Sequence, residues 1–335
     1  MIAKRRLMAG AVALATPALP RFALAAPEYQ WRLGHTAPES FPLHRRLVEA
    51  AAEIGEKSEG RIELIVKPDS QLGGQLGLLS QVRGGTVEVT PVTGQSLAGV
   101  LGPMFVQSVA FGFAGYEKLW AALDGDLGKA LRNQVQQRLG MVAMDRCWDF
   151  GFRQITTRNK PIATAADLVG LKIRTPVDPD LVGLFQALKA VPLGMNLQDL
   201  MPALQAGAVD AQDGILPLVQ AAQVYEQQRF CAITNHSWDG QWMCVNAKAW
   251  GRLSDKLKDV VAAALNKGGV AQRADTVANE SDVQKALTDK GMTFNKADPA
   301  SFRSALRSAG YYEKAKQRVG EDLWGLLEKY SGRLA

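Results

Sequence analysis

Arg174 is the residue whose position most clearly suggests chemistry, in the segment LKIRTPVDPDLV (171–182). Basic residues alternate with buriable ones from Leu171 to Thr175, which is typical of a half-buried strand. Pro176 cannot donate a ladder hydrogen bond, so the strand must end there. The guanidinium is thereby placed at the rim of a sheet, where open α/β proteins bind ligands beyond the strand ends. We expect Arg174 to bind an anion.

The chemistry of arginine narrows the choice of anion. A planar guanidinium matches a carboxylate with two parallel hydrogen bonds, which lysine cannot reproduce. The alternative is an internal ion pair between Arg174 and an Asp or Glu of the protein itself. A carboxylate is expected in either case.

The first 25 residues have the pattern of an export signal. Lys4, Arg5 and Arg6 precede an alanine-rich apolar run, and small residues lead up to Ala25, where we expect cleavage. The run is too short and too interrupted by prolines for the ~20 apolar residues that a membrane span needs. We therefore expect a periplasmic protein. The Arg5-Arg6 pair leaves the choice between the general and the twin-arginine export routes open.

Charge and cysteine content exclude several classes of protein. The segment 1–25 contains four basic and no acidic residues, so its removal lowers the formal charge from +6 to +2. No run of basic residues with interleaved aromatics remains, which argues against a nucleic-acid partner. The three cysteines, Cys147, Cys231 and Cys244, lack metal-ligand spacing. We expect buried thiols, with room for one disulfide bond.

The remaining chain reads as mixed α/β and is long enough for two domains. Apolar alternation predicts strands at 29–33, 62–66 and 86–90 with helices between them, a β-α-β-α-β opening. A long helix is expected from Leu253 to about Lys290, and the glycine pair at 268–269 could kink it. No composition break marks a linker, which suggests that the chain crosses between the domains more than once.

Three segments carry a family resemblance. The runs PDSQLGGQ (68–75), GFRQITTRNKPIATAADLVGLKIRTP (151–176) and LMPALQAGAVDAQDG (200–214) resemble the substrate-binding proteins of tripartite ATP-independent periplasmic (TRAP) transporters, the DctP family. The resemblance covers essentially the whole exported chain. It implies two α/β domains joined by crossing strands and a long kinked helix, with an organic acid bound in the cleft between them.

The resemblance also implies how the chain divides. The first domain would comprise 26–150 plus about 239–278, and the second 151–238 plus about 279–335. It further implies a monomer that delivers its ligand to the membrane subunits of a TRAP permease, with neither a cofactor nor a required metal.

By the same resemblance, Arg174 and Arg153 hold the ligand carboxylate. Arg153 could instead brace Asp149 or Asp213 at the domain junction. The segment VDAQDG departs from the family pattern, because many relatives have an asparagine that contacts the ligand where this chain has Gly214. Asp213 could orient an arginine or a ligand hydroxyl, or be a surface acid.

The segment TNHSWDGQW (234–242) offers further contacts. Trp238 could form an apolar wall against the ligand while His236 donates a hydrogen bond, although a tryptophan is also a common core residue. His35, after the first strand, could likewise contact the ligand. Phe111 and Phe113 are expected in the core, with one of them possible at the site.

No catalytic pattern is present. His35, His44 and His236 are the only histidines and are not in zinc-binding spacing, and neither a nucleophile elbow nor a phosphate loop occurs. We therefore expect a non-enzymatic receptor for a small organic acid. A binding protein of an ATP-driven (ABC) transporter or a ligand-sensing receptor system has the same architecture and stays open as an alternative, ahead of a periplasmic enzyme.

Overall fold

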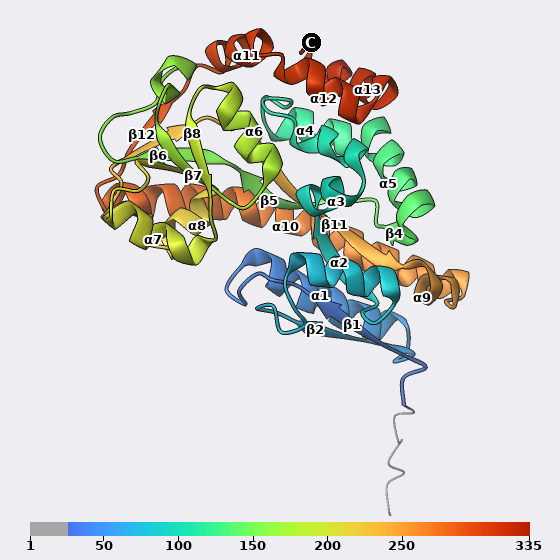
Figure 1. Cartoon of the computed structure of the whole chain (residues 1–335). Helices are drawn as coiled ribbons and strands as arrows, with labels where there is room; N and C mark the ends of the chain where they lie inside the picture. Colours follow the sequence, from blue (N-terminus) through green and yellow to red (C-terminus); the bar gives the residue numbers. More distant parts are fainter. Residues whose placement is uncertain (1–25) are drawn as a thin grey trace, which may run out of the picture.

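A computed structural model describes residues 26–335, so the predicted signal peptide lies outside the described residues. The chain forms two six-stranded sheets, called sheet A and sheet B, and helices pack around both (Figure 1). We call the parts built on them lobe A and lobe B. This is the two-domain α/β binding-protein fold expected from the sequence.

Sheet A has the strand order β2-β1-β3-β11-β4, and β5 also pairs with β11. β1 runs parallel to β2 and β3, whereas β11 is antiparallel to β3, β4 and β5. The β-α-β-α-β opening is therefore confirmed. The strands are β1 (Tyr29–Gly34), β2 (Ile62–Lys67), β3 (Val89–Thr93), β4 (Met141–Ala143), β5 (Trp148–Phe152) and β11 (Trp238–Asn246).

Sheet B has the order β12-β10-β6-β9-β7-β8. β7 is parallel to both β8 and β9, so the carboxyl ends of these three strands lie at one edge. The strands are β6 (Gln154–Thr157), β7 (Lys172–Thr175), β8 (Val191–Gly194), β9 (Ala211–Gly214), β10 (Phe230–Ile233) and β12 (Thr293–Lys296).

The chain passes between the sheets three times. β5 of sheet A and β6 of sheet B are separated only by Arg153, and β10 returns to β11 through residues 234–237. The third crossing is α10 (Asp255–Asp289), which packs on α1 and β5 at one end and on α8 at the other. Two of the crossings are only one and four residues long and the third is a continuous helix, which explains the absence of a linker in the sequence.

The helices of lobe A follow the apolar spacing of the sequence. In α1, Leu43, Leu47, Ala50 and Ile54 form the predicted buried face. The helices of this lobe are α1 (Pro42–Lys57), α2 (Gln75–Gly84), α3 (Gly94–Val100), η1 (Gly102–Ser108), α4 (Tyr116–Leu123), α5 (Asp126–Leu139) and α9 (Ala247–Gly251).

Lobe B has shorter helices, and the C-terminal segment contacts both lobes. α11 packs on α6 and η2, whereas α12 and α13 pack on η1, α4 and α5, along the top of Figure 1. The elements are η2 (Ala165–Leu168), α6 (Pro179–Ala187), α7 (Leu197–Gln205), α8 (Leu216–Ala221), η3 (Val224–Glu226), α11 (Pro299–Ser308), α12 (Tyr311–Val319) and α13 (Glu321–Ser331).

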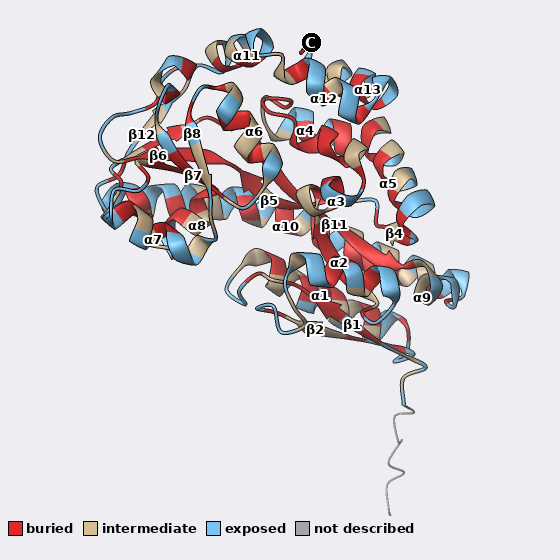
Figure 2. Ribbon diagram, viewed as in Figure 1, coloured by how far each residue is buried: buried red, intermediate tan, exposed pale blue. Residues whose placement is uncertain are grey.

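The glycine pair in α10 serves close packing. A Cβ at Gly268 would lie 3.0 Å from Cη2 of Trp148, and one at Gly269 would lie 2.9 Å from its Nε1. The absence of side chains thus lets the ring of Trp148 rest on the helix at the point where α10 passes β5. The strands of both sheets are largely buried, and exposed residues lie mainly on the outer helix faces (Figure 2).

Cys147, Cys231 and Cys244 are buried free thiols, so none of them forms the disulfide bond that the sequence allowed. Among residues 26–335, no helix is long and apolar enough to cross a membrane.

Candidate ligand-binding site

Arg174 lies on β7, near the carboxyl-end edge of sheet B, and is 5% exposed. Its Nε and Nη2 donate to the carbonyl oxygen of Met195, at 3.1 and 2.9 Å. Among the described residues, no carboxylate lies within ion-pair distance of Arg174. Burial lowers the pKa of Arg174 to about 10, partly opposed by Asp213. The internal ion pair considered for Arg174 is therefore not formed in this structure, and the guanidinium has capacity for an external anion.

Arg153, in contrast, is occupied by two aspartates. Its Nε and Nη2 donate to Oδ1 and Oδ2 of Asp213, both at 2.8 Å, and its Nη1 donates to Oδ2 of Asp239 at 2.7 Å. Nη2 also reaches the carbonyl oxygen of Asp213 at 3.2 Å. Asp213 belongs to β9 of sheet B and Asp239 to β11 of sheet A. These contacts favour the bracing interpretation of Arg153.

The pKa values of Asp213 and Asp239 are shifted in opposite directions. Burial alone would raise the pKa of Asp213, but Arg153 and then His236 outweigh it and hold that pKa well below its usual range. At Asp239 burial is the larger effect and raises the pKa, although Arg153 acts against it. Asp213 is therefore the firmly ionised partner of Arg153.

His236 is a buried member of this cluster. Its Nε2 lies 2.9 Å from Oδ1 of Asp213, and its Nδ1 lies 2.7 Å from Oγ1 of Thr234. Both ring nitrogens thus have protein partners. The structure brings His236, Asp213 and Arg153 together at the crossing between the lobes, as a connected polar network.

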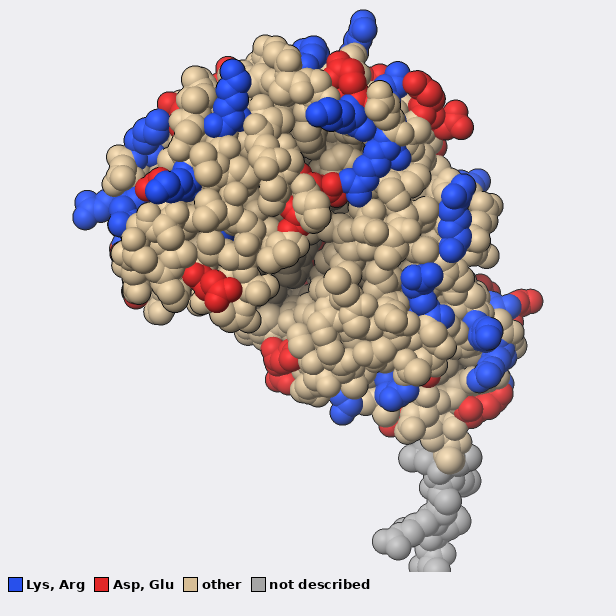
Figure 3. Space-filling view, in the orientation of Figure 1, with Lys and Arg blue, Asp and Glu red and all other residues tan. Residues whose placement is uncertain are grey.

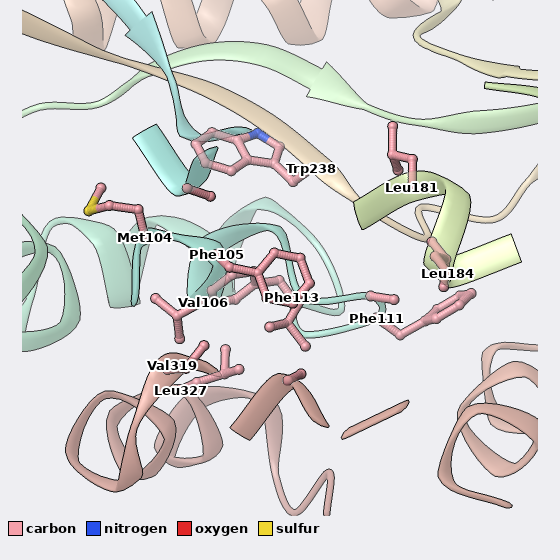
Figure 4. Packing of buried hydrophobic residues seen from close by; sticks show 14 of the residues in the cluster. Met104, Phe105, Val106, Phe111, Phe113, Leu181, Leu184, Trp238, Val319 and Leu327 are labelled. Carbon is pink, nitrogen blue, oxygen red and sulfur yellow. The ribbon is translucent and has the colours of Figure 1, made fainter. Parts of the chain in front are cut away.

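Trp238 is 2% exposed and points into the apolar core (Figure 4). Its Nε1 donates to Oδ1 of Asp149 at 2.8 Å, and its ring packs edge-on against Trp120. The ring also lies over Gly240, where a Cβ would be 1.7 Å from Cη2. Phe111 and Phe113 belong to the same buried cluster. The contacts of Trp238 are those of a core residue.

His35 belongs to lobe A, directly after β1, and is buried. Its Nε2 lies 3.1 Å from Nδ1 of His44, and its Nδ1 has no hydrogen-bond partner among the described residues. Burial lowers the pKa of His35 to about 4. His35 is thus a neutral histidine at the carboxyl end of a lobe A strand, apart from the Arg153 network.

Figure 3 shows a recess between lobe B and the part of lobe A that contains β1, β2 and α1. Three cavities of about 540, 610 and 620 Å³ open elsewhere on the described surface, and none is lined by any of the six predicted site residues. No group of three or more His, Cys, Asp and Glu residues within 26–335 could hold a metal ion.

Reasoning from sequence missed three residues near Arg174 and Arg153. Asp239 directly follows Trp238 on β11, so the side chains of these two residues leave opposite faces of the strand. The side chain of Asp239 is the one that contacts Arg153. Met195 and Gln212 gave no such signal, since Met195 contributes only its carbonyl oxygen and Gln212 is one of several glutamines in the chain.

Two α/β lobes joined by three crossings, with a buried arginine unpaired with any carboxylate at the strand ends, define a ligand-binding protein of the two-lobed kind. The chain belongs to the DctP family, the bacterial extracellular solute-binding proteins of family 7, whose model matches residues 33–317. Proteins of this family bind solutes as components of transport systems and are not enzymes, as the sequence predicted.

Individual relatives agree with this assignment. The 2,3-diketo-L-gulonate-binding periplasmic protein YiaO of Escherichia coli is 26% identical over 277 residues, covering 82% of this chain and 84% of YiaO. A TRAP periplasmic solute-binding protein from Ochrobactrum anthropi, with its C-terminus bound in the ligand-binding pocket, superposes with a TM-score of 0.86 at 26% identity, covering 91% and 97% of the two chains. One from Roseobacter denitrificans with bound L-galactonate gives 0.78 at 26% identity, covering 91% and 99%.

Proposed function

We propose that this protein is exported to the periplasm, captures a small organic acid by its carboxylate in the cleft between the lobes, and delivers it to the membrane subunits of a TRAP permease. The observation that carries the proposal is the buried guanidinium of Arg174, which has a carbonyl partner and, within residues 26–335, no carboxylate partner. A buried charge without a counter-ion is unfavourable, so a bound carboxylate would stabilise this site.

The remaining site residues take supporting roles in this proposal. Arg153, held by Asp213 of β9 and Asp239 of β11, joins the two sheets at the crossing. His236 completes that network. His35, at the carboxyl end of β1, would contact the ligand from lobe A, and Trp238 fixes the position of Asp149 from within the core.

Closure of the cleft would complete binding. When the lobes come together around the ligand, water leaves, and the charge-assisted hydrogen bonds to Arg174 become stronger in the lower dielectric. The expected moving units are residues 26–150 with about 239–278 and residues 151–238 with about 279–335. The closed, ligand-loaded monomer is the form that the permease would recognise.

A thermal-shift screen of the exported form tests the function. Carboxylic acids at about 100 times their dissociation constant should add ~2.7 kcal/mol to the free energy of unfolding, whereas their amides should add nothing. The screen should include sugar acids, short hydroxy acids, dicarboxylates and aromatic acids. Stabilisation by amides or neutral sugars, without stabilisation by any acid, would contradict the proposal.

A further inference from the structure

The side-chain amide of Gln212 lies next to Arg174 in sheet B. The two residues are paired in the parallel register of β7 and β9, so their side chains leave the same face of the sheet. Gln212 is 2% exposed, and its Nε2 has no hydrogen-bond partner among the described residues. Buried polar groups are nearly always hydrogen-bonded, so an unpartnered amide donor beside a ligand-binding arginine calls for a physical reason.

Gly214 provides the space for this amide. A Cβ at position 214 would lie 2.9 Å from Oε1 of Gln212 and 3.5 Å from its Nε2. The backbone of Gly214 is not left-handed, so its conformation does not require glycine. Glycine is needed here because it leaves free space: the amide of Gln212 occupies the position where the side chain of any other residue at 214 would begin.

The side chains of Arg174 and Gln212 extend in different directions along the same face of the sheet. Arg174 leans toward β8, because its Nε and Nη2 both bind the carbonyl oxygen of Met195 just beyond that strand. Gln212 extends along β9, on the other side of β7, toward the carboxyl end of the strand. Because β7 and β9 are neighbouring strands about 4.8 Å apart and both side chains leave the same face, an oxygen on the carbon next to a carboxylate held by Arg174 is within reach of the Gln212 amide.

We propose that Gln212 is a specificity-determining residue whose amide binds an oxygen on the carbon next to the ligand carboxylate. The preferred ligands are then 2-hydroxy or 2-keto acids. A hydroxyl can accept from Nε2 and donate to Oε1, and a keto oxygen can accept from Nε2. This inference rests on the proposed function, and it names the class of acid that the same site selects.

Gln154 is a matched control within the same sheet. It is paired with Gly214 across β6 and β9 and is also buried. Its amide, however, is fully used: Nε2 donates to Oδ1 of Asn235 at 2.7 Å, and Oε1 accepts from the backbone N–H groups of Thr234 and Asn235. Gln154 is therefore a structural amide that should not affect the choice of ligand.

Two variants remove the Gln212 amide from its position in different ways. Gln212→Met keeps a similar volume without a donor. Gly214→Ala keeps Gln212 but places a methyl group 2.9 Å from Oε1, so the amide must move. If both variants change ligand preference in the same way, the cause is the loss of the amide from its position and not a packing change particular to one variant. Gln154→Met controls for the loss of a buried glutamine in general.

Calorimetric titration with D-erythronate, L-galactonate, their 2-deoxy analogues and succinate tests the proposal. The protein should bind each 2-hydroxy acid at least about tenfold more tightly than its 2-deoxy analogue, as expected for one hydrogen bond. Gln212→Met and Gly214→Ala should each reduce that ratio to about twofold or less, and Gln154→Met should keep it.

An unchanged ratio in both variants, or equal binding of each pair by the unaltered protein, would overturn the role of Gln212. If succinate binds and neither 2-hydroxy acid does, the role of Gln212 is wrong and the proposed function stands. If no carboxylate binds in this panel or in the thermal-shift screen, the proposed function itself fails.

Discussion

The guanidinium of Arg153 and the carboxylate of Asp213 form a two-pronged salt bridge, with Nε to Oδ1 and Nη2 to Oδ2 both at 2.8 Å. Sixty residues separate the two in sequence, and both are almost completely buried. Because Asp239 takes the remaining Nη1 from the other sheet, this arginine ties the two lobes together at the crossing. Of the two site arginines, only Arg174 lacks a carboxylate partner in the part of the chain that the structure describes.

Arg153→Ala should therefore act on folding. Removing one member of a buried ion pair leaves uncompensated charge, which typically costs about 3–5 kcal/mol of unfolding free energy. Urea unfolding measures this loss. Arg45→Ala is the control, because Arg45 pairs with Asp275 at the surface, where such pairs contribute at most about 1 kcal/mol. Equal losses in the two variants would remove the bracing role from Arg153.

Arg174→Ala should act on binding. The variant loses two charge-assisted hydrogen bonds to the ligand, each of ~1.5–3 kcal/mol, so affinity should fall at least about a hundredfold. The unfolding free energy of the Arg174→Ala variant should be unchanged or higher, because the substitution removes a buried cation without a carboxylate partner among the described residues. Arg174→Lys should restore affinity only in part.

Calorimetric titration with the acid that best stabilises the protein, together with circular dichroism, measures both effects of the Arg174 variants. Tight binding by a folded Arg174→Ala protein would show that the ligand is held elsewhere.

The elements around Arg174 were predictable because their signals are local. Alternation and Pro176 define β7, and apolar spacing defines α1 and the start of α10. The sequence offered Asp213 as one possible partner of Arg153 but gave no reason to prefer it to Asp149. It did not suggest Asp239, which is 86 residues away and whose contact depends on how β11 returns to sheet A. The position of Gln212 over Gly214 likewise depends on the side-chain rotamer, which no sequence period encodes.

Trp238 is a second case in which tertiary packing decides the role of a residue. Trp238→Ala should cost about 3–5 kcal/mol, as for other buried aromatic residues truncated in a core. Trp238→Phe keeps most of the packing but leaves Oδ1 of Asp149 without its indole donor, at a cost of about 1–3 kcal/mol. Thermal unfolding of both variants measures this. If the Trp238→Ala protein is fully stable and binds an altered range of ligands, Trp238 lines the ligand cleft and is not a core residue.

The pH dependence of stability should reflect a buried pair of acids beside Trp238. The Tyr116 hydroxyl donates to Oε2 of Glu280 at 3.3 Å, whereas Oε1 of Glu280 and Oδ2 of Asp149 have no partner among the described residues. Burial, followed by the charge of Asp149, raises the pKa of Glu280 to about 7. Burial also raises the pKa of Asp149 to about 6.

A raised carboxyl pKa means that the folded protein binds more protons than the unfolded chain between the two pKa values. For Glu280 this window runs from its ordinary 4.5 to about 7, so its contribution to stability is lost as the pH rises through that range. The loss is at most about 3 kcal/mol, since each pKa unit corresponds to ~1.4 kcal/mol and partial exposure screens the charge. Glu280→Gln removes this charge and should flatten the dependence.

Thermal unfolding at pH 5 and pH 8 tests this prediction. The unaltered protein should lose more stability between these two pH values than Glu280→Gln does. Asp282→Asn, which changes an exposed acid on the same helix, should follow the unaltered protein. If the difference in melting temperature between the unaltered protein and Glu280→Gln is the same at both pH values, Glu280 does not titrate in this window, and the pair of acids must be held in another protonation state.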